Sequence, residues 1–253
     1  MIACEDTRHT QNLLEHYGIR KPLLSCHEHN EAGRAAEIVE RLQRGDSVAL
    51  VSDAGTPLVS DPGYRVVTAA VEAGFAVVPI PGASAALAAL AASGLPTDEF
   101  RFIGFLPSKS GARRKALEAL RNEPATIVAY ESPHRILDSL TDMADLFGDR
   151  PIVLAREITK IHEEFLRGPA ASIRSELAQR PSMKGEITLV IGRSEETGKL
   201  DDPLAEIARL QAEESLDRMD AIKTVAKRMR LPKRELYRLF AEQGNNPAHK
   251  RHD

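Results

Sequence analysis

Residues 48–63 of the 253-residue chain read V-A-L-V-S-D-A-G-T-P-L-V-S-D-P-G. The apolar run at 48–51 predicts a strand. It is followed at 53–63 by a loop that two glycines and two prolines make tight and stiff. In open α/β sheets ligands bind beyond the carboxyl ends of the strands, so a rigid loop here favours ligand contact at residues 53–57. Asp61 and Pro62 have a simpler explanation, as the cap and the first residue of the next helix.

Further short apolar runs occur at 76–80, 126–130, 152–155 and 187–191, separated by stretches with a helical spacing of apolar residues. This alternation predicts an α/β fold with mostly parallel sheets. Loop-like or polar breaks at 104–111 and 194–203 divide the chain into three expected parts: an N-terminal α/β domain at 1–106, a second α/β domain at 107–193 and a basic helical bundle at 200–245. Three helices are expected in or near the bundle, at 204–214, 218–230 and 232–242.

Composition excludes several classes of protein. The 34 basic and 37 acidic residues give a net charge of −3, which does not suit a uniformly basic nucleic-acid protein. No apolar run approaches the roughly 18 residues of a membrane span. Cys4 and Cys26 are too few for a disulfide framework and are typical of reduced thiols in a cytosolic protein. The run C-H-E-H at 26–29 would place at most two ligands on one face of a strand, which disfavours a metal site.

Three common enzyme motifs do not occur in the sequence: the G-x-G-x-x-G fingerprint, the P-loop and the G-x-S-x-G elbow. Their absence excludes the commonest α/β dehydrogenases, nucleoside triphosphatases and hydrolases.

Five polar motifs stand at predicted strand ends: C-E-D-T-R at 4–8, P-G-A-S-A at 81–85, Y-E-S-P-H-R at 130–135, R-E-I-T-K at 156–160 and K-G-E-I at 184–187. A helix that opens after a strand offers free N–H groups to a polar ligand group, and a glycine at 185 lets the backbone lie against a flat ring. Four of the five motifs also have an ordinary structural explanation. Ser84 and Asp6 could be helix caps, Glu131 and Arg135 an ion pair, and 156–160 a solvated loop.

The C-terminal region carries a concentration of positive charge. Residues 223–238 contain seven basic side chains and one acidic one, Glu235, while Ile222, Val225, Ala226 and Met229 fit a buried helical stripe. Basic side chains outside such a stripe bind a nucleic-acid backbone without reading its sequence. The alternative is a solvated helical face.

The motifs above, together with S-G-L-P-T-D-E-F at 93–100 and G-F-L-P at 104–107, occur in the order typical of the tetrapyrrole methylase superfamily. The chain resembles most closely its branch of ribosomal RNA small-subunit methyltransferases, from about Ile2 to Leu239. The resemblance implies a two-domain class III methyltransferase that uses S-adenosylmethionine and no metal. It implies 2′-O-methylation of a cytidine ribose in the decoding region of small-subunit ribosomal RNA. It also implies a homodimer in the cytoplasm, without membrane contact, whose partner is the small ribosomal subunit.

The resemblance places the cofactor in the cleft between the two α/β domains. The contacts that it implies are Asp53, Gly55, Thr56, Pro57, Ser84, Ala85, Tyr130, Glu131, Gly185, Glu186 and Ile187. Candidates for the proton acceptor are Glu5, Asp6, Glu131, His134 and Glu157, and we favour Glu5 and Glu131 as catalytic residues because each sits at a strand end. Candidates for RNA binding are Arg8, Arg135, Arg156 and Lys160 in the α/β domains and Lys227, Arg228, Lys233 and Arg234 in the basic bundle.

Members of this superfamily begin with a strand and a G-T-P-I-G-N-like loop, which the sequence as given does not contain. The first sheet is therefore expected to lack a central strand. Three other readings stay open: a tetrapyrrole C-methyltransferase, a DNA-binding module that acts through the basic bundle, and an inactive truncated fragment. The long loop at 53–63 and the basic bundle argue against the first.

Overall fold

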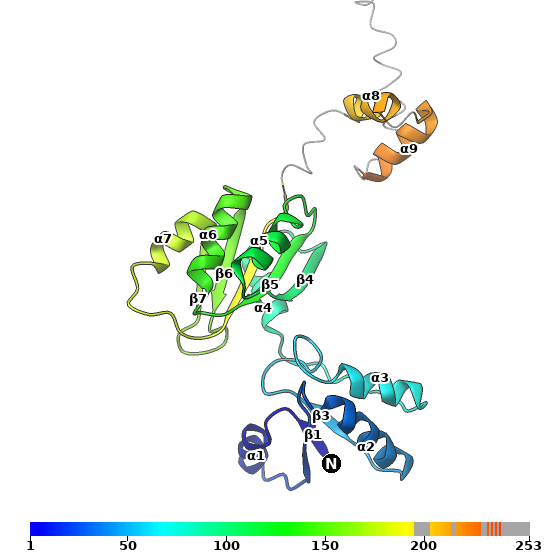
Figure 1. Ribbon diagram of the computed structural model, residues 1–253, viewed down its shortest axis with the longest axis vertical. Helices are drawn as coiled ribbons and strands as arrows, with labels where there is room; N and C mark the ends of the chain where they lie inside the picture. The colour runs from blue at the N-terminus through cyan, green and yellow to red at the C-terminus, as the bar shows by residue number, and fades with distance from the viewer. Residues whose placement is uncertain are drawn as a thin grey trace, which may run out of the picture. The chain divides into compact units, whose positions relative to one another are not determined.

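The computed structural model describes residues 1–194, 203–213 and 216–228, and singly residues 232, 234, 236 and 238 (Figure 1). Its contacts divide the chain into two compact units. The larger unit joins Met1–Glu118 to Ala125–Gly192. The smaller unit joins Ala119–Pro124 to the residues from Arg193 onward.

The first sheet of the larger unit has three parallel strands, in the order β2-β1-β3. These are β1 (Ile2–Cys4), β2 (Leu23–Ser25) and β3 (Ala49–Val51), accompanied by helices α1 (Thr7–His16), α2 (Glu31–Gln43) and α3 (Tyr64–Glu72). Ala3, Leu24, Ile38 and Val66 form the centre of its buried core. The predicted strand at 48–51 is confirmed as β3, and β1 is short, with three residues.

The predicted strand at 76–80 is wrong. The described residues include no strand that pairs with this segment, and Val78 and Ile80 are 74% and 81% exposed. An apolar run becomes a strand only where a neighbouring strand takes up its backbone N–H and C=O groups, which the run itself does not reveal.

The second sheet has five strands in the order β4-β5-β8-β6-β7. They are β4 (Phe100–Phe105), β5 (Thr126–Glu131), β6 (Pro151–Arg156), β7 (Glu164–Pro169) and β8 (Ile187–Ile191). Only β4 and β5 pair in parallel, whereas β5–β8, β6–β8 and β6–β7 are antiparallel. The expectation of mostly parallel sheets is therefore wrong for this sheet. The connection between β6 and β7 is too short for the crossover that parallel strands need.

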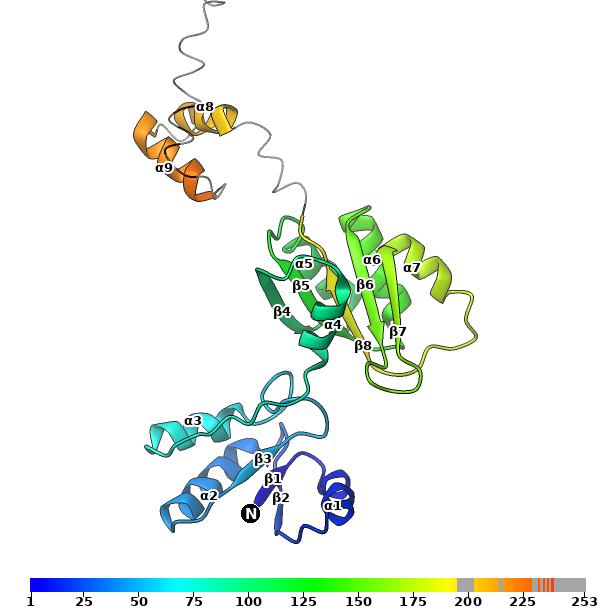
Figure 2. The same ribbon diagram turned by 180° about the vertical axis from the view of Figure 1, so that it is seen from behind.

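Four helices pack on the second sheet: α4 (Ala85–Ser93), α5 (Ser110–Glu118), α6 (Ile136–Phe147) and α7 (Ala170–Leu177). Seen from opposite sides, α4 covers one face and α5, α6 and α7 cover the other (Figures 1 and 2). Small residues on α4, Ala86 and Ala89, allow close packing against the valines of the three central strands. Helix α4 and strand β4 therefore belong to the layers of the second sheet, although their residues fall within the N-terminal domain expected at 1–106.

The smaller unit contains α8 (Pro203–Glu213) and α9 (Arg218–Arg228), close to the helices expected at 204–214 and 218–230. Ile207, Leu210, Ile222 and Val225 are fully buried in a core of their own, which confirms most of the expected stripe. Met229 and most of the helix expected at 232–242 lie outside the described residues. Within the described parts of the chain, no helix has the length and hydropathy needed to cross a membrane.

Candidate active site

A cavity of about 360 Å³ opens in the larger unit where several of the predicted motifs meet. Its walls come from residues 54–56 and 59–61 after β3, from Ser84 and Ala85 at the start of α4, from residues 130–133 at the end of β5, and from residues 185–188 at the start of β8. The ring of Phe105 completes the lining. Two of the expected cofactor residues, Asp53 and Pro57, do not line this cavity. The others all line it: Gly55, Thr56, Ser84, Ala85, Tyr130, Glu131, Gly185, Glu186 and Ile187.

The loop after β3 is fixed by contacts at both ends. Near its start, the Thr56 hydroxyl donates to the carbonyl oxygen of Ala83, at 3.1 Å, which ties the loop to the turn before α4. Leu58 and Ser60 have φ values of 73° and 67°, a region that costs energy for residues other than glycine. The loop therefore holds a strained shape that its surroundings impose.

The far end of this loop is held by Glu31, whose side chain comes from the start of α2. Its Oε1 accepts hydrogen bonds from the backbone N–H groups of Gly63, at 2.9 Å, and Arg65, at 2.7 Å. Glu31 is 7% exposed. It satisfies the first N–H groups of α3, whose N-cap residue, Gly63, has no side chain to do so. The interpretation of Asp61 as the cap of α3 is therefore wrong.

Ser84 is both a helix cap and part of the cavity wall. Its Oγ accepts a hydrogen bond from Leu87 N at 3.4 Å, and Ala85 opens α4 beside it. The structural explanation and the binding explanation are thus compatible, because a helix N-terminus keeps further N–H groups for a ligand.

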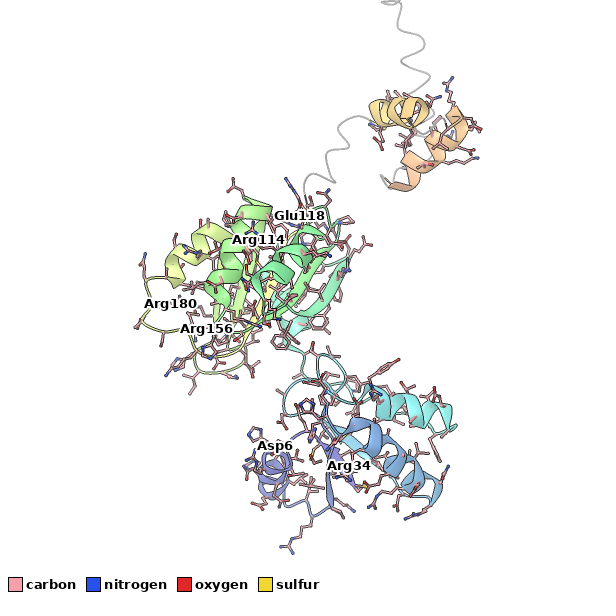
Figure 3. All side chains as sticks on the ribbon, in the orientation of Figure 1. Asp6, Arg34, Arg114, Glu118, Arg156 and Arg180 are labelled. Atoms are coloured by element: carbon pink, nitrogen blue, oxygen red, sulfur yellow. The ribbon has the colours of Figure 1, made fainter. Side chains whose placement is uncertain are left out.

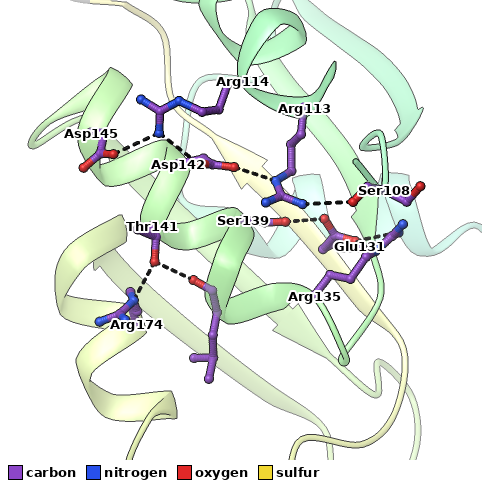
Figure 4. Close-up of polar contacts among 11 residues, drawn as sticks. Ser108, Arg113, Arg114, Glu131, Arg135, Ser139, Thr141, Asp142, Asp145 and Arg174 are labelled. Carbon is purple, nitrogen blue, oxygen red and sulfur yellow. Dashed lines mark hydrogen bonds and ion pairs between the residues drawn. The ribbon is translucent and has the colours of Figure 1, made fainter. Parts of the chain in front are cut away.

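Glu131 is buried, and its two oxygens accept four hydrogen bonds, of which those from Arg135 and Ser139 are drawn in Figure 4. Oε1 accepts from Ser132 N at 2.6 Å and from Nε and Nη2 of Arg135 at 3.1 and 2.9 Å, and Oε2 accepts from Ser139 Oγ at 2.5 Å. The ion pair between Glu131 and Arg135, which was the structural explanation for this motif, is present. This geometry favours an anchoring role for Glu131, because few lone pairs are left to take a proton from a substrate.

Asp61 lines the cavity and titrates differently from an ordinary aspartate. Burial raises its pKa, the charge of Asp53 adds to the increase, and a hydrogen bond from Ser52 opposes it. Burial also raises the pKa of Glu5, with the charges of Asp53 and Asp61 adding to the effect, but Glu5 does not line the cavity. Burial together with the charge of Asp61 raises the pKa of Tyr130, which also lines the cavity, and a hydrogen bond with the backbone of Ala86 acts against the increase.

Two of the other proton-acceptor candidates have pKa values lowered by hydrogen bonds. The side chain and the backbone N–H of Arg8 hold the pKa of Asp6 well below its usual range, and Asp6 caps α1. Lys160 and the N–H of Glu186 lower the pKa of Glu157. His134 is exposed and does not line the cavity.

The candidate RNA-binding residues of the α/β part are engaged by carboxylates. Arg8 pairs with Asp6 at 2.6 Å, although its side chain stays 86% exposed. Arg135 binds Glu131, and Lys160 binds Glu157. Arg156 shares the carboxylate of Glu164 with Arg180, which lies beside it (Figure 3). In the smaller unit, Arg234 is exposed, while the side chains of Lys227, Arg228 and Lys233 lie outside the described part.

The sequence matches a family model, that of the Tetrapyrrole (Corrin/Porphyrin) Methylases, over residues 1–174. Similar solved structures include diphthine synthase, with a TM-score of 0.55 and 16% identity over 76% of this chain and 78% of that one. The methyltransferase CobJ gives a TM-score of 0.52 with 20% identity, over 76% of this chain and 93% of that one. At these identities the two structures establish the fold alone.

Curated relatives are much more similar in sequence. Ribosomal RNA small subunit methyltransferase I of Xylella fastidiosa is 47% identical over 244 residues, which cover 94% of this chain and 88% of the relative. The protein of the same name from Synechocystis is 44% identical over 96% of this chain and 88% of its own length. The chain therefore belongs to the tetrapyrrole methylase family, in the branch formed by ribosomal RNA small subunit methyltransferase I.

Proposed function

We propose that this protein transfers a methyl group from S-adenosylmethionine to the 2′-oxygen of a cytidine ribose in the decoding region of small-subunit ribosomal RNA. The observation that carries the proposal is the meeting of the 54–61 loop, the start of α4, the end of β5 and the start of β8 around one cavity. Relatives that match almost the whole chain are named for methylation of this RNA. The motif resemblance supports action as a homodimer on the small subunit in the cytoplasm.

The residues around the cavity suit S-adenosylmethionine. Phe105 and Tyr130, whose ring centroids are 5.4 Å apart, give an apolar side, and the glycine backbone at 185 suits a flat ring. The start of α4 suits a carboxylate. Asp61 brings a carboxylate to the cavity, which favours a cationic ligand, whereas Glu131 and Glu186 are paired with Arg135 and Lys160. When bound, this cofactor supplies a methyl group that is carried on a sulfonium. The remainder of the cofactor, a neutral thioether, is the leaving group.

We propose Asp61 as the proton acceptor, in preference to Glu5 and Glu131. Of the three carboxylates that line the cavity, Glu131 already accepts four hydrogen bonds, and Glu186, 76% exposed, pairs with Lys160. Asp61 is half-buried, and its raised pKa makes it a stronger base than an ordinary aspartate. Its carboxylate takes the proton of the ribose hydroxyl as that oxygen attacks the methyl carbon.

The substitution Asp61→Asn tests this role. We expect the single-turnover rate of methylation of small ribosomal subunits to fall about 10²- to 10⁴-fold, which is the usual contribution of a general base. The affinity for S-adenosylmethionine, measured by calorimetry, should change by less than about fivefold, because the amide keeps the shape of the side chain. Glu5→Gln is the matched control and should retain most of the rate. A wild-type rate in Asp61→Asn together with a large loss in Glu5→Gln would return the role to Glu5.

The target nucleotide is tested separately. Small subunits methylated with labelled S-adenosylmethionine should carry the label on a ribose, where it makes the adjacent phosphodiester bond resistant to alkali, at a cytidine of the decoding region. Label on a base, on another region of the RNA, or only on a tetrapyrrole offered in the same assay contradicts the proposal.

A further inference from the structure

The R-E-I-T-K motif, residues 156–160, has a backbone shape that its own sequence does not favour. Glu157 and Thr159 have φ values of 51° and 69°, in the left-handed region. Thr159 is β-branched, and such residues rarely adopt this conformation. Strained backbone of this kind persists only where contacts impose it, and it occurs often at functional sites.

The residues with this strained backbone form hydrogen bonds with the wall of the cavity. The backbone N–H of Glu157 donates to the carbonyl oxygen of Glu186, at 3.0 Å. The backbone N–H of Glu186 in turn donates to Oε1 of Glu157, also at 3.0 Å. One residue thus holds both backbone polar groups of Glu186, a residue that lines the cavity.

Lys160 and Arg156 extend the same attachment. Lys160 Nζ donates to Oε1 of Glu157 at 2.8 Å and to Oε2 of Glu186 at 3.2 Å. Arg156 Nη1 donates to the carbonyl oxygen of Lys184 at 3.2 Å. The loop 156–160 therefore binds the residues on both sides of Gly185.

Gly185 fits this arrangement in two ways. Its φ is 95°, which side-chain-bearing residues rarely adopt. A Cβ at this position would lie 2.5 Å from Cγ of Glu157 and 2.6 Å from its Oε1. The Glu157 side chain occupies the space that a residue other than glycine would need, so the loop 156–160 and the cavity wall are fitted to one another.

We propose that Glu157 and Lys160 are positioning residues that hold segment 184–187 in the shape required for cofactor binding. This role replaces proton transfer for Glu157 and RNA contact for Lys160, and it rests on the proposed use of the cavity for S-adenosylmethionine. The ammonium group of Lys160 already lies between two carboxylates, which leaves it less suited to bind an RNA phosphate. Glu157, whose side chain is 17% exposed, lies behind the wall and does not line the cavity.

The test compares Lys160→Met and Glu157→Gln with Lys115→Met, an exposed lysine on α5 that serves as a control for the loss of one positive charge. Three quantities are measured on the full chain: the Kd for S-adenosylmethionine by calorimetry, hydrogen exchange of residues 185–188 without ligand, and the Kd for small subunits at several salt concentrations. We expect Lys160→Met to weaken cofactor binding at least fivefold and to speed exchange at 185–188. The salt dependence of subunit binding should be unchanged.

Further variants keep the result interpretable. Lys160→Arg should restore most of the cofactor affinity, and Gly185→Ala should lower it more than Glu157→Gln does. Unchanged exchange and unchanged cofactor affinity in Lys160→Met, with a weaker and less salt-dependent subunit affinity, would overturn the proposal in favour of RNA contact. Wild-type protein that binds no S-adenosylmethionine would refute the proposed function instead, while the exchange measurement would still test the attachment of 184–187.

Discussion

Several buried or half-buried carboxylates of this protein have structural duties that their sequence positions do not reveal. Glu164 is one of them. It accepts hydrogen bonds from Arg180 at 2.6 and 2.7 Å and from Arg156 at 3.1 Å. These bonds lower the pKa of Glu164 from 4.5 to about 2. The charged form is therefore favoured in the folded protein, and the carboxylate joins the start of β7 to Arg156 at the end of β6 and to Arg180 beyond α7.

This shift predicts a pH-dependent stability. A carboxylate with a lowered folded-state pKa adds stability above its unfolded pKa, near 4.5, and the contribution is lost as the pH falls toward about 2. We expect Glu164→Gln to reduce the free energy of unfolding by about 1–3 kcal/mol at pH 7, after allowance for solvent screening, and by clearly less near pH 3. Urea unfolding at both pH values measures the difference, with Glu72→Gln on α3 as the exposed control. An equal loss at both pH values would assign the effect to packing and not to charge.

At the scale of elements, the strands of the second sheet that the sequence predicted are those whose two faces are both covered. β5, β6 and β8 are buried nearly throughout and read as continuous apolar runs. β4 and β7 escaped prediction because they are the edge strands of their sheet and carry mixed polar and apolar residues. The run at 76–80 failed for the opposite reason, since it is apolar but has no strand partner among the described residues.

The candidate site likewise has features that the local sequence predicted and features that depend on distant partners. Motifs beside strands located much of the cavity, since residues 54–56 follow β3, residues 132–133 follow β5 and residues 185–186 precede β8. The motif at 81–85 also reaches the cavity, although the strand expected before it, at the described residues 76–80, is absent. Duties that depend on a partner far along the chain were missed. Asp61 has the local pattern of a helix cap, but Glu31, from a much earlier part of the sequence, performs that duty. The Glu157–Gly185 contact likewise joins two motifs that the sequence could only treat separately.

The cap of α3 yields a prediction for that element. Glu31→Ala leaves the N–H groups of Gly63 and Arg65 without their acceptor, one of them buried. We expect the free energy of unfolding to fall by about 1–3 kcal/mol. Cofactor affinity should fall as well, because the far end of the 54–61 cavity loop is released. Thermal melting and calorimetry check both effects. Glu28→Ala, at an exposed position of the same region, is the control, and a melting temperature equal to that of this control would contradict the capping role.

At the scale of the whole molecule, the two compact units favour a division between chemistry and substrate binding. All residues that line the cavity belong to the larger unit. The smaller unit has its own apolar core and carries the basic residues of 223–238. Loss of its helices should therefore leave the cavity intact while it removes positive charge that is suited to an RNA backbone.

Removal of residues 200–253 tests this division. We expect the affinity for small ribosomal subunits to fall, and the slope of log K against log salt to become shallower by about 0.7–0.9 for each phosphate that is no longer neutralised. The affinity for S-adenosylmethionine should stay within about twofold of the full chain, which serves as an internal control for folding of the larger unit. A milder variant, Lys233→Gln with Arg234→Gln, should make the slope shallower by about the amount that one or two phosphates contribute. If both variants keep the slope of the full chain, subunit binding must come from the larger unit, and Arg8, the most exposed of its candidate RNA-binding arginines, would become the first position to test.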